Sequence, residues 1–271
     1  MSDHVTPFTS EQVGSKAVRF SSKGVFATHK DHMVDPYAAT RIPKEHQVQG
    51  FYYWPQDTPQ RPSIVLLHDK WGLMQDFRDL AVRLACEGYV VMVPNLYGRQ
   101  GGMVTTSEEV ADALAERIDG TAVLQDINAS CEFLNANLTE DPSMELTLRN
   151  AHAVVGMGMG GALAILFALK RKRLRAAVSF YGALPDPLDS IGSLQCHLLY
   201  HAADTNGTVT AAGLEQLGHV AREAGKTVDV RRYTGTREGF CDVVRPDVYN
   251  KSLARQAWDE TIAFLNRQLP V

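Results

Sequence analysis

The sequence predicts an α/β fold built on a mainly parallel, doubly wound sheet with helices on both faces. Two apolar runs, at residues 62–69 and 89–95, are continuous rather than alternating, which is typical of strands covered on both faces. Such runs alternate along the chain with longer stretches that carry apolar residues at helical spacing. That order indicates crossover units, which join neighbouring parallel strands through a helix.

The expected elements follow one another from residue 46 to the last residues of the chain. Further strands are expected at 46–55, 151–156, 175–182, 196–202 and 227–235. Helices are expected at 73–88, at 107–138 with a break at Gly120, at 161–172, at 211–224 and at 254–269. Residues 1–46 are polar and irregular apart from strand character at 16–20. We interpret them as an N-terminal extension packed on a single domain at 47–271.

Bulk composition indicates a cytoplasmic globular protein. A net charge of −4 gives no reason to expect nucleic acid or an anionic membrane as partner. The first ten residues lack the basic and apolar regions of a secretory signal, and no window holds the roughly 18 apolar residues of a spanning helix. The four cysteines lie far apart without metal-type spacing, so we expect no metal and no cofactor.

Candidate functional residues follow the expected strands, because ligands of open α/β sheets bind beyond the carboxyl ends of the strands. Asp69 and Lys70 come directly after one strand and Arg99 soon after the next. The stretch "VVGMGMGGALA" at 154–164 places a run of glycines between a strand and a helix, and Asp204 and Glu238 follow the last two strands.

These residues carry a resemblance to a known family. The stretch "LLHDKWGL" followed by "LAVRLACEGYVVMVPNLYGR" strongly resembles the dienelactone hydrolases, which are α/β hydrolases that cleave carboxylic esters and lactones. The glycine run, "SFYGAL", the turn at Asp204 and "YTGTREGF" follow in the order of that family, so the resemblance covers about residues 47–269. It implies an α/β-hydrolase fold for this chain.

The resemblance also implies a catalytic triad, and this chain departs from it at two of three positions. The family places a Ser or Cys nucleophile at the centre of Gly-x-[Ser/Cys]-x-Gly, followed by an acid and a His. The corresponding residues here are Gly158, Asp204 and Glu238, of which only Asp204 has the expected chemical type. Restoring both missing groups with Gly158→Ser and Glu238→His is expected to return esterase activity, since triad members act as a unit.

Four residues remain candidates for ligand binding. The backbone N–H of Met159 occupies the place of the family's oxyanion site, at a helix N-terminus that attracts anions. Arg99 matches an arginine that holds the substrate carboxylate in the family, and Asp69 stands where the family often has a Glu beside the nucleophile. With Lys70 next to Asp69, these residues predict a pocket for a small carboxylate or lactone-like compound.

Two functions from different classes remain open, with a third as a minor alternative. The leading hypothesis is a pseudoenzyme: a non-hydrolytic dienelactone hydrolase-like protein that binds a small anionic ligand, a protein partner or a second copy of itself. The alternative is an enzyme that acts on a lactone, ester or carbonyl compound through Glu238 and Asp204, two carboxylates that share a proton or a cation if they lie close together. The minor alternative is dinucleotide binding at Gly156–Gly161, although the next strand lacks the acidic residue such a site needs.

Overall fold

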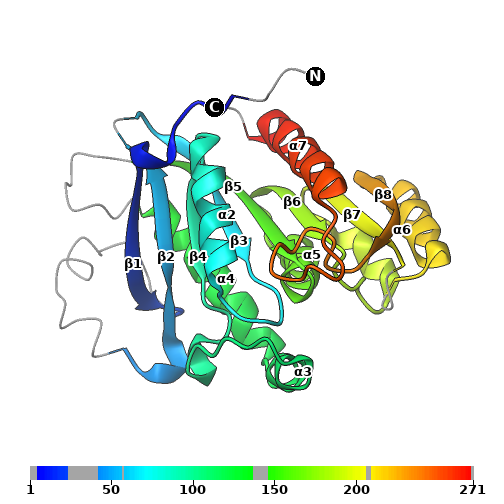
Figure 1. Cartoon of the computed structure of the whole chain (residues 1–271), viewed down its shortest axis with the longest axis horizontal. Helices are drawn as coiled ribbons and strands as arrows, with labels where there is room; N and C mark the ends of the chain where they lie inside the picture. Colours follow the sequence, from blue (N-terminus) through cyan, green and yellow to red (C-terminus); the bar gives the residue numbers. More distant parts are fainter. Residues whose placement is uncertain (1–4, 24–41, 57, 137–145, 206–208, 270–271) are drawn as a thin grey trace. The chain divides into compact units, whose positions relative to one another are not determined.

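The chain divides into two compact units in the computed structural model, which describes residues 5–23, 42–56, 58–136, 146–205 and 209–269 (Figure 1). The first unit comprises Met1–Leu66 and Trp71–Ala151, and the second comprises Leu67–Lys70 and His152–Val271. Much of the expected N-terminal extension, residues 24–41, lies outside the described residues, and the division at residue 46 stays a prediction.

The first unit holds four strands in the hydrogen-bonded order β1-β2-β4-β3, of which β3 and β4 are parallel and the other two pairs antiparallel. The residues expected to have strand character near 16–20 form the edge strand β1, which pairs with β2 along its whole length. The elements of this unit are η1 (Ser10–Gln12), β1 (Val13–Ser21), η4 (Lys44–His46), β2 (Gln47–Pro55), β3 (Arg61–Leu67), α2 (Gln75–Cys86), β4 (Val90–Pro94), η5 (Gly98–Gln100), α3 (Glu108–Glu116) and α4 (Gly120–Asn135).

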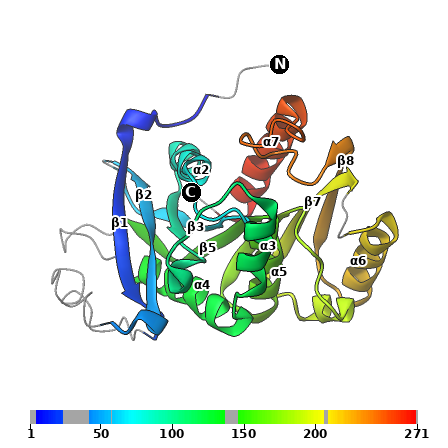
Figure 2. The ribbon, with the colours of Figure 1, turned by 60° about the horizontal axis from the view of Figure 1, so that its bottom comes forward.

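Helices cover both faces of the strands in this unit, α2 on one side and α4 on the other (Figure 2). Side chains alternate between the two faces of a strand, so successive residues of β2 contact different helices. Tyr52 packs edge-on against Phe133 of α4, with ring centroids 5.7 Å apart. The adjacent Tyr53 accepts a 3.2 Å hydrogen bond from Arg78 of α2, so its side chain lies on the opposite face.

The second unit holds four parallel strands in the order β5-β6-β7-β8. Helix α7 covers one face, and α5 and α6 cover the other (Figure 2). The elements are β5 (Thr147–Met157), which begins in the first unit, then α5 (Met159–Lys170), β6 (Leu174–Phe180), η6 (Leu188–Ser193), β7 (His197–Thr205), α6 (Ala211–Glu223), β8 (Val228–Arg237) and α7 (Lys251–Gln268). The eight strands are therefore mainly parallel, and the predicted sequence of elements is confirmed.

Helix boundaries follow from capping residues. The break expected at Gly120 separates α3 from α4, because the Asp119 carboxylate accepts hydrogen bonds from the Thr121 and Ala122 N–H groups and so begins a new helix. Thr210 caps α6 through the Gly213 N–H, and Asn250 caps α7 through the Leu253 N–H. No helix in the described part of the chain is long and apolar enough to cross a membrane.

A buried histidine fastens α7 to the sheet. His201 of β7 lies 2.8 Å from the hydroxyl of Thr261 and 2.7 Å from that of Tyr233. The Thr261 hydroxyl donates its one hydrogen to the Ala257 carbonyl, so His201 Nε2 donates to Thr261. The Tyr233 hydroxyl lies between two acceptors, His201 Nδ1 and the Glu260 carboxylate at 2.9 Å. Burial, followed by the nearby charge of Arg231, lowers the pKa of His201 to about 3, which keeps the ring neutral. His201 is therefore a hydrogen-bonded packing residue of the core.

Replacing Thr261 with Val should destabilise the fold. The change keeps the shape of the side chain but leaves the His201 Nε2–H buried without an acceptor, at a cost of about 1–3 kcal/mol. Urea unfolding followed by circular dichroism measures the loss. The matched control is Thr234→Val at an exposed position of β8, which should change stability by less than about 0.5 kcal/mol. Equal effects of the two changes would show that the Thr261–His201 contact contributes nothing.

Candidate functional site

The turn between β5 and α5 has the backbone geometry of a nucleophile elbow without a nucleophile. Gly158 lies there with φ 51° and ψ −116°, a strained conformation that the sequence-based hypothesis of an elbow requires. Its N–H donates to the Phe180 carbonyl over 2.9 Å, and its own carbonyl accepts the first hydrogen bond of α5 from the Ala162 N–H over 3.0 Å. Both contacts hold the sharp reversal from strand to helix.

The other glycines of the run allow close backbone packing. A Cβ atom at Gly160 would collide with the carbonyl oxygens of Leu67 and His68, and one at Gly156 would collide with the Gly160 carbonyl. The start of α5 therefore packs directly on the end of β3 and on the strand that precedes it. Gly161, the third glycine of the Gly-x-Gly-x-x-Gly spacing, is closed in as well, since a Cβ atom there would lie 2.8 Å from the Ser179 hydroxyl and 3.0 Å from the Phe180 carbonyl. Close packing at Gly156 and Gly161, with the turn at Gly158, accounts for the spacing without a dinucleotide.

The carboxylate of Asp69 fills the space that a nucleophile would occupy. A Cβ atom at Gly158 would overlap both carboxylate oxygens of Asp69. The Asp69 Oδ1 accepts a 2.9 Å hydrogen bond from the Met159 N–H and a 2.6 Å hydrogen bond from the Lys70 N–H. The N–H expected to serve as an oxyanion site thus already donates to a carboxyl group of the protein itself.

The position of Asp69 alters the chemistry of its carboxyl group. Desolvation raises its pKa above the ordinary value, and the hydrogen bonds from Met159 and Lys70, with the charge of Lys70, oppose this rise in part. The charge of Asp242 raises the pKa further. The residue still keeps an intermediate fraction of its surface accessible to solvent. Asp69 is therefore a desolvated carboxyl group on a residue that is itself only partly buried.

Further acidic groups gather around Tyr181, which follows β6. This residue adopts φ 45°, lies buried and donates its N–H to the His201 carbonyl over 2.8 Å. Burial raises the pKa of Tyr181 well above its ordinary value, and the nearby Cys241, Asp69, Asp242 and Glu238 raise it further in that order. The phenol is therefore neutral and lies in a negative environment.

Sequence reasoning missed three members of this group: Tyr181, Cys241 and Asp242. Each was visible as a polar residue beyond a strand end, Tyr181 in "SFYGAL" and the other two directly after "REGF". None departs from an ordinary loop composition, so only the fold reveals that Tyr181 and Asp242 lie near Asp69 and that Cys241 lies near Tyr181.

The two remaining triad-equivalent positions lie at the ends of β7 and β8. The exposed Asp204 accepts a 2.9 Å hydrogen bond from the Gly235 N–H and donates its own N–H to the Thr236 hydroxyl over 3.3 Å. Glu238 is half-buried, and its charge acts on Tyr181 and Tyr200. The expected pairing of Asp204 with Glu238 stays a prediction, whereas the charge of Asp242 does raise the pKa of Asp69.

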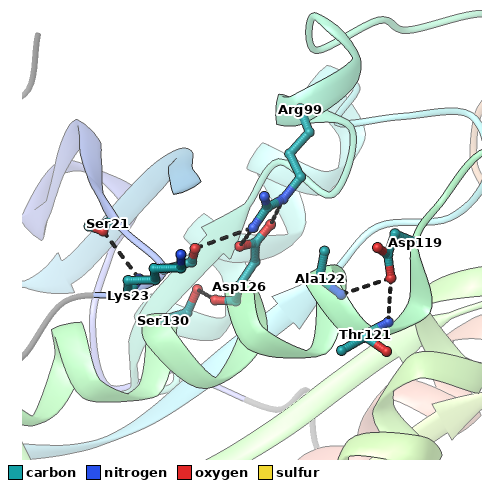
Figure 3. Close-up of polar contacts among 9 residues, drawn as sticks. Ser21, Lys23, Arg99, Asp119, Thr121, Ala122, Asp126 and Ser130 are labelled. Atoms are coloured by element: carbon teal, nitrogen blue, oxygen red, sulfur yellow. Dashed lines mark hydrogen bonds and ion pairs between the residues drawn. The ribbon is translucent and has the colours of Figure 1, made fainter. Parts of the chain in front are cut away.

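Arg99, the fourth candidate for ligand binding, belongs to the first unit and is bound to an acidic residue there. Figure 3 shows its guanidinium turned toward Asp126 of α4. Nε and one terminal nitrogen donate to the two carboxylate oxygens over 3.0 and 2.6 Å, and the same terminal nitrogen donates to Ser22 over 3.2 Å. This two-pronged ion pair fixes η5 on α4, so Arg99 has a structural role whether or not it also meets a ligand.

Within the described ranges, no group of three or more His, Cys, Asp or Glu side chains could hold a metal ion. All four cysteines are free thiols. The chemistry available near the elbow is thus that of carboxyl groups, a phenol, a thiol and the ammonium group of Lys70.

The parallel strands, the elbow at Gly158 and the acid at the end of β7 define the class of the α/β hydrolases. The model of the "Dienelactone hydrolase family" matches residues 48–269. The chain belongs to this family.

Individual relatives agree with this assignment. A "Putative carboxymethylenebutenolidase" of Saccharolobus solfataricus is 27% identical over 238 residues, which cover 78% of this chain and 91% of that protein. A "Probable 2-oxo-3-(5-oxofuran-2-ylidene)propanoate lactonase" of Bradyrhizobium sp is 23% identical over 79% of this chain and 87% of the relative. The crystal structure of a "Putative Dienelactone Hydrolase" from Klebsiella pneumoniae superposes with a TM-score of 0.75 at 20% identity, covering 93% of this chain and 98% of that one, and shows the same fold.

Two glycine variants separate backbone strain from the collision with Asp69. Gly158 and Gly225 both have positive φ, but a Cβ atom at Gly225 meets nothing within 4 Å. Gly225→Ala should cost about 1 kcal/mol for the conformation alone. Gly158→Ala should cost about 1–3 kcal/mol more, because the methyl group overlaps a carboxylate. Thermal and urea unfolding measure the difference, and adding Asp69→Ala to Gly158→Ala should recover most of it. Equal costs at the two glycines would mean that Asp69 does not occupy this space.

Proposed function

We propose that this chain is a member of the dienelactone hydrolase family that does not hydrolyse esters through an elbow nucleophile and instead binds a small ligand at Asp69. The observation that carries the proposal is the Asp69 carboxylate on the Met159 N–H, in the space of the absent nucleophile. An acyl group placed there would meet neither a nucleophile nor an empty oxyanion site, and both are needed for acyl transfer.

The charge around the site supports a ligand without negative charge. The sequence favoured a small anion because of the Met159 N–H, but an anion would have to displace Asp69 and approach Asp242 and Glu238. Bringing a negatively charged ligand close to these carboxyl groups costs free energy unless one of the charges is neutralised. A neutral compound that offers a hydrogen-bond donor to Asp69 meets no such cost.

The names of the relatives favour a second candidate function, hydrolysis of a lactone or ester. In this chain such a reaction would need a nucleophile away from the elbow, and the half-buried Cys241 near Tyr181 is one thiol in the vicinity. Glu238 and Asp204 would then have to supply the acid and base.

Hydrolysis assays distinguish the two functions. The purified protein should hydrolyse p-nitrophenyl acetate and dihydrocoumarin no faster than its Cys241→Ser and Asp204→Asn variants, because the elbow has no attacking group. Spectrophotometric rates at pH 7–8 provide the measurement. A clear turnover that disappears in either variant would overturn the proposal in favour of the second function.

The structure changes the expectation for a restored triad. Gly158→Ser with Glu238→His should stay inactive, because the new side chain at position 158 collides with Asp69 and the Met159 N–H stays occupied. Adding Asp69→Ala should allow measurable hydrolysis of p-nitrophenyl acetate, since an empty oxyanion donor is worth roughly 10²–10³ in rate. Full activity in the double variant would show that Asp69 moves aside readily and does not block the elbow.

A further inference from the structure

We propose that Asp69 is a general base that removes a proton from carbon in a small, uncharged ligand. This inference rests on the proposed function, because it requires that the elbow carries no nucleophile. It goes further by naming a reacting atom, Oδ2 of Asp69, and a class of ligand, a neutral carbon acid such as a carbonyl compound with an acidic C–H.

The two oxygens of Asp69 have different environments. Oδ1 accepts both backbone hydrogen bonds, from the Met159 and Lys70 N–H groups. Oδ2 accepts no hydrogen bond from any described residue and lies beside Gly158, in the space that a nucleophile side chain would take. Two donors on Oδ1 fix the plane of the carboxylate, while Oδ2 keeps its lone pairs for a ligand. A positioned base with one open oxygen meets the geometric requirement for proton transfer.

The surroundings make this carboxylate a stronger base than one in water. Desolvation disfavours the charged form, and the charge of Asp242 adds to this effect, so both raise the pKa. A base is most effective when its pKa lies near the working pH, which a carboxyl group reaches only through such a shift. The geometry identifies Oδ2 as the reacting oxygen, and the raised pKa of Asp69 makes the carboxylate a better proton acceptor.

Lys70 supplies the opposite charge that such a reaction needs. Its ammonium group is near enough to lower the pKa of Asp69. Removing a proton from carbon leaves negative charge on the ligand, and a nearby cation stabilises that charge. Asp242 raises the pKa of Asp69, whereas Lys70 lowers it.

A suitable probe is 5-nitrobenzisoxazole, an uncharged carbon acid. Asp69 Oδ2 takes the proton from ring carbon C3. The C–H electron pair forms the nitrile, the N–O bond breaks, and its electrons remain on the phenolate oxygen. The Asp69 carboxyl group then returns its proton to water, so no further reactant is required. Release of the coloured phenolate gives the rate directly.

The decisive variants are Asp69→Asn and the exposed control Asp189→Asn. Asp69→Asn keeps an oxygen for the two N–H groups but removes the base, so kcat/KM should fall by about 10²-fold or more. Asp189→Asn should leave it unchanged. Melting temperatures confirm that each variant folds.

The pH profile distinguishes a base from a residue that only shapes the site. The rate should rise with pH as Asp69 loses its proton, with a midpoint above the ordinary aspartate pKa of about 4. Lys70→Met removes a cation and should move this midpoint up, whereas Asp242→Asn removes an anion and should move it down. Midpoints that stay in place in both variants would overturn the inference.

Chemical labelling tests whether small molecules reach Asp69. Treatment with a water-soluble carbodiimide and glycine methyl ester, followed by peptide mass spectrometry, should modify Asp69. Failure of the carbodiimide to modify Asp69, or modification without any elimination of the probe, would overturn the inference. If either result is found and the protein has no esterase activity, the inference fails but the proposed function is kept. If the protein hydrolyses esters through a nucleophile, both the inference and the proposed function are wrong.

Discussion

The hydrogen bond from the Met159 N–H to Asp69 is the interaction on which the site depends. It joins the end of β3 to the N-terminus of α5, where unsatisfied N–H groups and the helix dipole favour an anion. In an active hydrolase these donors stabilise the negative charge that develops on the substrate during the reaction. Here the Asp69 carboxyl group already accepts a hydrogen bond from one of them, so the elbow keeps its geometry while that donor is occupied.

The strain at Gly158 explains why the turn persists. Backbone at φ 51° and ψ −116° is costly for most residues but not for glycine, so loss of the nucleophile side chain relieves strain in the turn rather than adding it. The contacts that enforce the reversal, Gly158 with Phe180 and α5 with the end of β3, use only backbone atoms. They are therefore independent of which side chain stands at the elbow.

The sequence was sufficient to predict most of the fold, because its information lies in local patterns. Continuous apolar runs predicted strands, helical spacing predicted helices, and Asp119 with Gly120 marked the break between α3 and α4. The elbow at Gly158 also followed from the pattern. The role of Asp69 could not be derived, because it depends on a contact across 90 residues between one carboxylate and one N–H. Tyr181 and Asp242 were missed for the same reason, and the ion pair of Arg99 with Asp126 required knowledge of how η5 lies on α4.

The two departures from the triad pattern, at positions 158 and 238, are physically linked to the position of Asp69. A side chain at position 158 and the Asp69 carboxylate cannot share one space, so a nucleophile there would require Asp69 to lie elsewhere. Without a nucleophile at position 158, a histidine at position 238 would have no proton to accept, so triad chemistry does not require one there. Asp69 in turn gains the two backbone donors that hold Oδ1, and its other oxygen then faces whatever enters the site. Under the proposed function, the reactive group of this site is therefore Asp69 after the end of β3 rather than a residue at the start of α5, and its role is to accept a proton rather than to attack carbon.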